Sequence, residues 1–278
     1  MDISEILSEV GWLRKSSGQH LLLDQVLLER IVGYGEITKD DIVLEIGTGV
    51  GNLTELLSRE AGKVISIEKD PKLLEIARRQ LQKRKNVVLI REDALRVDFP
   101  EFTKVVSNLP YGISSPLTFK LLERDFRLGV LMYQKEFAER MIARPGTEAY
   151  SRLTVGVHYR ADVEILEEVP PAAFFPQPKV TSVVVRVKPR KPPFKVSDEK
   201  MFFSVVKALF QHRRQLVKNS LFHSFEQVFP GRRFQKTEKK EIIDKIIPKE
   251  LAERRVMDLP PEAFARIAEL LKEFRFSP

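Results

Sequence analysis

The spacing of hydrophobic and polar positions changes near Ile42. Residues 1 to about 40 show helical spacing on both sides of a basic connector at residues 13–20. Beyond it, short runs rich in β-branched residues alternate with segments whose apolar positions recur at helical spacing. The runs that predict strands are residues 42–47, 63–70, 86–93, 104–110 and 128–134, and the segments that predict helices are residues 52–61, 71–84, 115–123 and 135–144.

This alternation predicts the fold class. Strands joined by helices form right-handed crossovers, which give a parallel sheet covered by helices on both faces. Two longer β runs, residues 153–169 and 180–189, follow one another and could pair antiparallel. We therefore expect an α/β fold whose sheet has a reversed strand at one edge.

A proline-rich, charged segment, "KPRKPPF" at residues 188–194, interrupts the regular pattern and is typical of a linker. Helical spacing returns beyond it, in residues 198–225, 237–247 and 260–274. The sequence thus predicts a first domain over residues 1–190 and a smaller, all-helical domain over residues 195–278.

The composition narrows the class of protein. Of 278 residues, 43% are hydrophobic, which is ample for a core. No apolar run approaches the roughly 20 residues that span a bilayer, and the N-terminus lacks the pattern of a secretory signal. The chain has 0 Cys, which excludes disulfides and thiolate metal sites, and its 4 His show no metal-ligand spacing. We expect a soluble, cytoplasmic protein without a bound metal.

The positive charge is concentrated in one part of the chain. The formal net charge is +8, and ten Lys or Arg against two acids lie between Arg186 and Lys218. A solvated surface would account for such a stretch. A predominantly positive segment at a domain junction also favours a polyanionic partner.

A glycine loop follows the first predicted strand, in "LEIGTGVGNLT" at residues 44–54. Gly47 and Gly49 let the backbone turn sharply and approach a ligand closely, so both are candidate cofactor-binding residues. The spacing alone also fits an ordinary tight turn. A dinucleotide fingerprint would place its third glycine where this chain has Asn52. Glu45 would repel phosphates, which favours a cationic or neutral ligand.

Two acids end the next two predicted strands. Glu68 could accept hydrogen bonds from both hydroxyls of a ribose, and Asp93 from the exocyclic amine of an adenine. Each could instead be a helix cap. Three successive predicted strands thus each end in residues suited to one part of a single ligand. Together they indicate an adenosine that carries a positive group. S-adenosylmethionine fits this description.

The fourth predicted strand ends in Asn108, Leu109, Pro110 and Tyr111. An adenine amine is a poor nucleophile because its lone pair is delocalised into the ring, so it needs acceptors for its hydrogens. The Asn108 side-chain oxygen and the Leu109 carbonyl, held by Pro110, could be these acceptors. Tyr111 could stack on the base. A simple proline turn is the competing interpretation.

Residues 108–111 after a strand, with the glycine loop upstream, resemble the S-adenosylmethionine-dependent N6-adenine methyltransferases. "SSGQHLLLD" at residues 16–24 and "FFPQPKVTSVVVRV" at residues 174–187 narrow the resemblance. The chain is similar to the ribosomal RNA small-subunit adenine dimethyltransferase family from about Gly18 to its C-terminal helices. The resemblance implies a Rossmann-like methyltransferase sheet, S-adenosylmethionine as cofactor, and a helical domain that binds RNA or the ribosomal subunit.

The resemblance also implies roles for single residues. It makes Asn108 the catalytic-motif residue and assigns donor contacts to His20, Leu22, Gly47, Glu68, Asp93 and Asn108. Relatives commonly carry Phe directly after the His or Asn of the N-terminal motif, where this chain has Leu21. This departure bears on the packing of that segment.

Phe174 and Phe175 precede prolines in "FFPQPKV" and could stack on a flipped base opposite Tyr111. A hydrophobic plug between domains is the alternative for each ring. The resemblance favours Phe175, which we predict to sandwich the base with Tyr111.

RNA gives the basic stretch a partner, because Lys and Arg neutralise phosphates. We predict that "QHRRQLVKNSL" forms a helix with its cations near one face. The predicted RNA-binding residues are Arg190, Lys191, Arg213, Arg214 and Lys218.

The resemblance implies an enzyme that transfers two methyl groups to N6 of each of two adjacent adenosines. The target would be a hairpin loop near the 3′ end of 16S-type small-subunit rRNA, and the reaction a step of small-subunit biogenesis. We expect a monomer whose partner is small-subunit rRNA or the pre-30S subunit. A large-subunit rRNA adenine methylase and a non-catalytic, RNA-binding assembly factor are the alternatives; the second is disfavoured because every donor and catalytic position is present.

Overall fold

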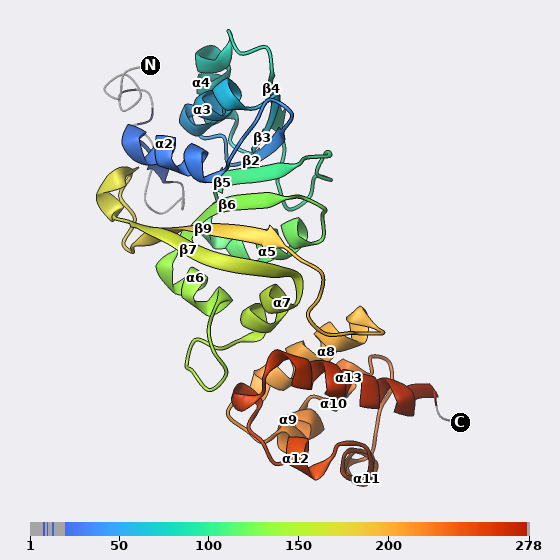
Figure 1. Ribbon diagram of the computed structural model, residues 1–278. Helices are drawn as coiled ribbons and strands as arrows, with labels where there is room; N and C mark the ends of the chain where they lie inside the picture. Colours follow the sequence, from blue (N-terminus) through green and yellow to red (C-terminus); the bar gives the residue numbers. More distant parts are fainter. Residues whose placement is uncertain (1–7, 9, 11–12, 14–19, 277–278) are drawn as a thin grey trace. The chain divides into compact units, whose positions relative to one another are not determined.

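The computed structural model describes residues 20–276 together with Ser8, Val10 and Leu13 (Figure 1). The chain forms two compact units. Residues 1–138 and 162–189 make up the first, called here the sheet unit, and residues 139–161 and 190–278 the second, called the helical unit. Apart from Leu13 and His20, the predicted basic connector lies outside the described residues.

The sheet unit is built on a seven-stranded sheet with the order β4-β3-β2-β5-β6-β9-β7. Strands β2 to β6 pair in parallel, and β9 runs antiparallel to β6, so the predicted sheet with a reversed strand is confirmed. The bounds are β2 (Ile42–Ile46), β3 (Lys63–Glu68), β4 (Val87–Arg91), β5 (Lys104–Asn108), β6 (Leu128–Gln134), β7 (Ala161–Val169) and β9 (Ser182–Pro189). A separate antiparallel pair joins β1 (Leu21–Leu22) to β8 (Phe174–Phe175).

Helices cover both faces of this sheet, as predicted. Successive strand residues point their side chains to opposite faces, so the apolar side chains on each face need a layer of helices. In β6, Val130 and Met132 pack in one apolar cluster with residues of α2 and α3. Tyr133, on the other face, hydrogen-bonds through its hydroxyl to Thr118 of α5 at 2.8 Å. The helices of this unit are α2 (Gln25–Tyr34), α3 (Asn52–Glu60), α4 (Pro71–Leu81), α5 (Ser114–Leu122) and α6 (Lys135–Met141), which ends in the helical unit.

The helical unit packs its helices around a core that includes Phe202, Phe225 and Phe264. Its helices are α7 (Arg152–Arg160), α8 (Glu199–Leu209), α9 (Val217–His223), α10 (Phe225–Val228), α11 (Lys236–Ile246), α12 (Lys249–Ala252) and α13 (Pro261–Phe276). Within the part of the chain that the structure describes, no helix is long and apolar enough to cross a membrane.

The prediction of one long β run over residues 153–169 was wrong. Its first half is helix α7, and only Ala161–Val169 forms a strand. Val155 and Tyr159 of α7 are buried in the core of the helical unit, and Thr154 accepts a hydrogen bond from the Ser151 backbone N–H at 3.1 Å. Tertiary packing therefore overrides the strand propensity of this segment. The chain crosses between the units around residues 139–161 as well as at residue 190, whereas the sequence predicted a single crossing.

The prediction of a continuous basic helix was also wrong. Helix α8 ends at Leu209, and α9 begins only at Val217. Between them the backbone forms tertiary bonds: the Arg213 carbonyl accepts from Met257 N–H at 2.9 Å, and the Gln215 carbonyl from Val256 N–H at 3.0 Å. Because these carbonyls bond residues far along the chain, the segment does not continue the helix.

A buried charge joins the amino ends of three strands. Asp41, only 1% exposed, accepts from Thr103 Oγ1 at 2.7 Å and from Lys104 Nζ at 3.1 Å, and it also pairs with Arg127. Burial alone would raise the pKa of Asp41, but these hydrogen bonds outweigh it and lower the pKa below its usual range. Asp41 therefore stabilises the fold above the pKa of the unfolded chain, and this stabilisation is lost as the pH falls below it.

We predict that Asp41→Asn costs about 3–5 kcal/mol of unfolding free energy at pH 7, because it leaves the buried Lys104 ammonium without its counter-charge. Urea unfolding followed by circular dichroism measures the loss, which should narrow at pH 3. Asp98→Asn, at a fully exposed partner of Arg124, is the control and should change stability by less than about 0.5 kcal/mol. Equal effects of the two substitutions would contradict the role of Asp41.

Candidate active site

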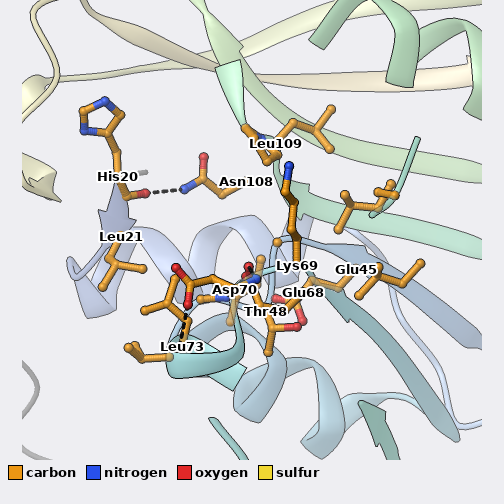
Figure 2. A pocket seen from close by; sticks show the side chains of 18 of the residues that line it. His20, Leu21, Glu45, Thr48, Glu68, Lys69, Asp70, Leu73, Asn108 and Leu109 are labelled. Carbon is orange, nitrogen blue, oxygen red and sulfur yellow. Dashed lines mark hydrogen bonds between the residues drawn. The ribbon is translucent and has the colours of Figure 1, made fainter. Parts of the chain in front are cut away.

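A cavity of about 560 Å³ lies where strands β2, β3, β4 and β5 end (Figure 2). The carboxyl edge of a parallel sheet is where α/β folds bind ligands. The lining comes from residues 20–22, 45–50, 67–71, 92–94 and 108–113, with Leu28, Asn52, Leu53 and Leu73. Every predicted cofactor-binding residue is in this lining, so the fold brings together motifs that are far apart in the sequence.

The glycine loop allows a close approach of neighbouring segments. Gly47 and Gly49 adopt φ of 89° and 56°, a region that other residues rarely enter. A Cβ at Gly49 would lie 2.9 Å from a methyl of Leu21, and one at Gly47 would lie 3.4 Å from the Asn108 carbonyl oxygen. Larger residues would therefore disturb both the loop and its contact with β5.

Glu68 is held at the end of β3 by backbone donors. Its two carboxylate oxygens accept from Gly49 N–H and Asp70 N–H, each at 2.9 Å. The side chain is 8% exposed, and burial raises its pKa against the effect of these hydrogen bonds. Each carboxylate oxygen can accept a second hydrogen bond, so Glu68 retains acceptors for a diol.

Glu45 is buried at the floor of the cavity, with 1% of its surface exposed. One carboxyl oxygen accepts from Thr54 Oγ1 at 2.6 Å and Ser66 Oγ at 2.5 Å. The other, Oε1, is buried and has no hydrogen-bond partner among the described residues. Burial raises the pKa of Glu45 to about 8, so it is largely protonated at neutral pH. The prediction that Glu45 repels phosphates by its charge was therefore wrong, because a protonated carboxyl group carries none.

Asp93 follows β4 and belongs to the same lining. Its Oδ1 accepts from Leu95 N–H at 2.9 Å, and this bond lowers its pKa. Lys69 Nζ lies 3.5 Å from its Oδ2. Lys69 lines the cavity, but sequence reasoning missed it. The signal that could have found it is the pairing of β3 with β4, which brings the residues after Glu68 next to those after Arg91.

Asn108 ends β5 with a defined side-chain orientation. Its Nδ2 donates to the backbone carbonyl of His20 at 3.1 Å, as Figure 2 shows. The side-chain oxygen is thereby left to accept other donors. Pro110 follows with an extended backbone, and within the described part of the chain no hydrogen bond to the Leu109 carbonyl is found. The structure therefore places two neighbouring acceptors at the cavity.

Tyr111 is fixed at both ends of its side chain. Its hydroxyl lies 2.5 Å from Ser182 Oγ, and its ring stacks on the His20 imidazole with centroids 5.6 Å apart. Burial raises the pKa of the Tyr111 hydroxyl. His20 Nδ1 in turn lies 2.6 Å from the Pro176 carbonyl. The stacking of His20 on Tyr111 gave no signal in the sequence.

Phe174 and Phe175 lie in β8, outside the cavity lining. Phe174 is buried among residues of α2 and α3. Phe175 is half-buried against a cluster that includes Leu21, with which its backbone pairs. The sandwich of a base between Phe175 and Tyr111 stays a prediction.

The predicted RNA-binding residues, all in the helical unit, divide into two groups. Three of them contact their own unit: Arg190 donates to the His158 carbonyl at 2.7 Å, Arg213 to the Glu148 carbonyl at 2.6 Å, and Lys218 pairs with Glu253 at 2.6 Å. Lys191 and Arg214 are exposed, and among the described residues neither has an ion-pair partner. These two residues are therefore better placed to bind RNA phosphates than the other three.

The Rossmann-like sheet, with a glycine loop, a carboxyl group at the end of β3 and an Asn-Leu-Pro-Tyr motif at one cavity, defines the class of adenine methyltransferases. A family model described as ribosomal RNA adenine dimethylase matches residues 12–273. The chain belongs to this ribosomal RNA adenine dimethylase family. The predictions of the family and of an rRNA adenine dimethyltransferase are thereby confirmed, and membership implies a methyl donor of the S-adenosylmethionine type.

Relatives cover almost the whole chain. A probable ribosomal RNA small subunit methyltransferase A of Methanothermobacter thermautotrophicus is 48% identical over 97% of this chain and 95% of its own length. A probable ribosomal RNA small subunit methyltransferase A of Methanosarcina acetivorans is 46% identical over 98% of this chain and 99% of its own length. The crystal structure of a dimethyladenosine transferase from Plasmodium falciparum is similar with a TM-score of 0.76 and 32% identity, covering 92% and 97%. The crystal structure of the 23S rRNA methyltransferase ErmE is similar with a TM-score of 0.64 and 28% identity, covering 91% of this chain and 99% of that one.

Glu45 yields a prediction about pH and stability. Because its pKa is raised in the folded protein, the fold holds a proton that the unfolded chain releases above about pH 4.5, and wild-type stability falls as the pH rises toward 8. Glu45→Gln removes this titration. The variant should gain stability relative to wild type by roughly 1.4 kcal/mol for each pH unit in this window. Urea unfolding between pH 5 and 8 measures the difference.

The matched control is Glu92→Gln, which removes an exposed carboxylate from the same lining. It should keep the pH dependence of the wild type. Parallel pH profiles of wild type and Glu45→Gln would show that Glu45 is ionised throughout.

Proposed function

We propose that this protein uses S-adenosylmethionine to dimethylate N6 of two adjacent adenosines in a hairpin loop near the 3′ end of small-subunit rRNA, as a step of small-subunit biogenesis. The observation that carries the proposal is the Asn108 side chain, which the His20 carbonyl orients in the same cavity as Glu68 and the glycine loop. Relatives named as small-subunit methyltransferases support the small subunit as the target.

The residues of the cavity fit an adenosine-type methyl donor. Glu68 has acceptors for a ribose diol, and Asp93 Oδ2 is within reach of an exocyclic amine if Lys69 turns aside. At the floor, Glu45 Oε1 is buried without a partner among the described residues, which suits a polar group of a ligand. S-adenosylmethionine, when bound, supplies a methyl group on a sulfonium, from which a neutral thioether is a good leaving group.

On the acceptor side, the protein must compensate for the poor nucleophilicity of the adenine amine. In the first transfer, the Asn108 oxygen and the Leu109 carbonyl each accept one N–H of the amine, so that its lone pair is directed toward the methyl group. In the second transfer, one of the two accepts the single N–H that the monomethylated amine retains. Both acceptors are preorganised, Asn108 by its bond to the His20 carbonyl and Leu109 by the following proline. Preorganised polar groups lower a barrier because they need no rearrangement during the reaction.

Tyr111 provides an aromatic face for the target base. Its hydroxyl is tied to Ser182 on β9, so the ring is held in place. The His20 ring stacks on it, and a base that stacks on Tyr111 from the same side would displace His20. Phe175 lies one residue before Pro176, whose carbonyl contacts His20, so a shift of His20 would reach β8.

We predict that Asn108→Ala and Asn108→Asp lower the single-turnover rate of methyl transfer about 10²- to 10³-fold, as loss of one preorganised polar contact does in other enzymes. Donor affinity, measured by calorimetry, should stay close to that of the wild type. Asn219→Ala, which removes an exposed amide in the helical unit, is the matched control and should leave the rate unchanged. Normal turnover of both Asn108 variants would refute the acceptor role.

The target is tested with labelled S-adenosylmethionine and two substrates, undermethylated small subunits and naked large-subunit rRNA. We expect label in small-subunit rRNA, with two methyl groups on each of two adjacent adenosines by mass spectrometry of its fragments.

The similarity to a 23S rRNA methyltransferase makes large-subunit rRNA the second candidate substrate. Label confined to large-subunit rRNA would favour that enzyme over our proposal. Tight RNA binding without any label would favour a non-catalytic assembly factor.

A further inference from the structure

The helical unit carries a second basic segment, which the sequence analysis did not single out. Arg232, Arg233, Lys236 and Lys240 are exposed, and within the described part of the chain none of them has an acidic ion-pair partner. Lys239, which lies among them, is instead paired with Glu226. The four exposed cations are called the 232–240 basic surface below.

Some cations elsewhere in this unit are paired. Arg160 lies 2.7 Å from Glu199, and Arg266 lies 3.1 Å from Glu250. Lys218 is likewise paired with Glu253. Other exposed cations of the unit, Lys191 and Arg214 among them, also lack an ion-pair partner among the described residues. The 232–240 segment differs because four such cations lie within nine residues.

Aromatic packing holds this segment against the helical core. Gly231 turns the chain with a φ of 84°, and the Arg232 N–H donates to the Phe229 carbonyl at 3.2 Å. The Phe234 ring then packs against Phe225 and Phe229, with centroids 4.9 and 5.8 Å apart. The backbone that carries the cations is thus anchored while their charged ends face solvent.

The spacing of the lysines is costly for the isolated protein. Lys236 and Lys240 lie four residues apart in α11, which places them on one helix face about 6 Å apart along the axis. Like charges at this spacing destabilise a helix. A polyanion bound along this face would remove the repulsion, whereas no acid among the described residues does so.

The chemistry of the surface favours nucleic acid over protein. Protein interfaces bury an apolar centre with a polar rim. The exposed large hydrophobic side chains among the described residues are Val26, Val88, Leu95, Ile142 and Val180, and none lies between residues 229 and 246. Contacts to phosphates need only positive charge.

We propose that the 232–240 basic surface binds the phosphate backbone of the RNA substrate, with each cation neutralising a phosphate. This inference rests on the proposed function because it takes RNA as the partner. It adds a binding surface in the helical unit to the catalytic cavity of the sheet unit.

The test compares two triple variants that lose the same charge. One is Arg232→Ala, Arg233→Ala and Lys240→Ala. The control is Lys63→Ala, Lys83→Ala and Lys85→Ala, at exposed positions near the starts of β3 and β4, the sheet edge opposite the cavity. Affinity for a naked small-subunit rRNA fragment is measured against salt concentration. Because log K falls with log salt by about 0.7–0.9 for each phosphate contact, the slope of the first variant should be less steep than that of the wild type by roughly 2–3. The slope of the control should be almost unchanged.

Equal slopes for the two variants and the wild type would overturn the proposal. A loss of affinity seen with assembled subunits but not with naked RNA would also overturn it, in favour of a protein partner. Single-turnover methylation at saturating RNA should be unchanged in the first variant, since the cavity is intact. If the wild type itself neither binds nor methylates RNA, the proposed function is wrong. If the wild type methylates RNA but the salt slopes are equal, only the proposed role of the 232–240 basic surface is wrong.

Discussion

The parallel register of β2, β3, β4 and β5 is the constraint on which the candidate site depends. Parallel strands present their carboxyl ends at one sheet edge, so the loops that follow them converge. Pairing of Ile46 with Ile67 and of Glu68 with Arg91 fixes how far each strand extends. A shift of one residue would turn Glu68 away from the cavity, because side chains alternate between faces. The sheet thereby positions the glycine loop, the acids and Asn108 together.

Within this frame, burial decides which carboxyl groups carry charge. Glu45, Glu68 and Asp93 line one cavity but meet different surroundings. Burial raises the pKa of Glu45 to about 8, while backbone and lysine contacts lower that of Asp93. The floor of the cavity is therefore largely neutral, and the negative charge lies nearer the Asp93 side. A ligand with hydroxyl and amine groups at that side suits this distribution better than one with phosphates.

The basic residues also separate by their surroundings. Arg213 supports the fold of its own unit through the carbonyls of Glu148 and Tyr150, although its position in the sequence suggested a contact with RNA. Arg232 and Arg233, which the sequence analysis passed over, face solvent beside an aromatic anchor. Counting charges along a chain does not distinguish these roles, because an arginine can satisfy its donors internally or externally.

The sequence by itself determined the alternation of strands and helices from β2 to α6, the parallel sheet and the residues at the strand ends. These follow from local periodicity, and Glu68 and Asn108 stand where a strand pattern stops. Only the tertiary structure decided that residues 152–160 are helical, since their apolar side chains enter the core of the helical unit. It also decided the orientation of Asn108, which depends on a carbonyl 88 residues away. Periodicity reports what each segment can bury, whereas orientation and ionisation depend on long-range neighbours that no local pattern contains.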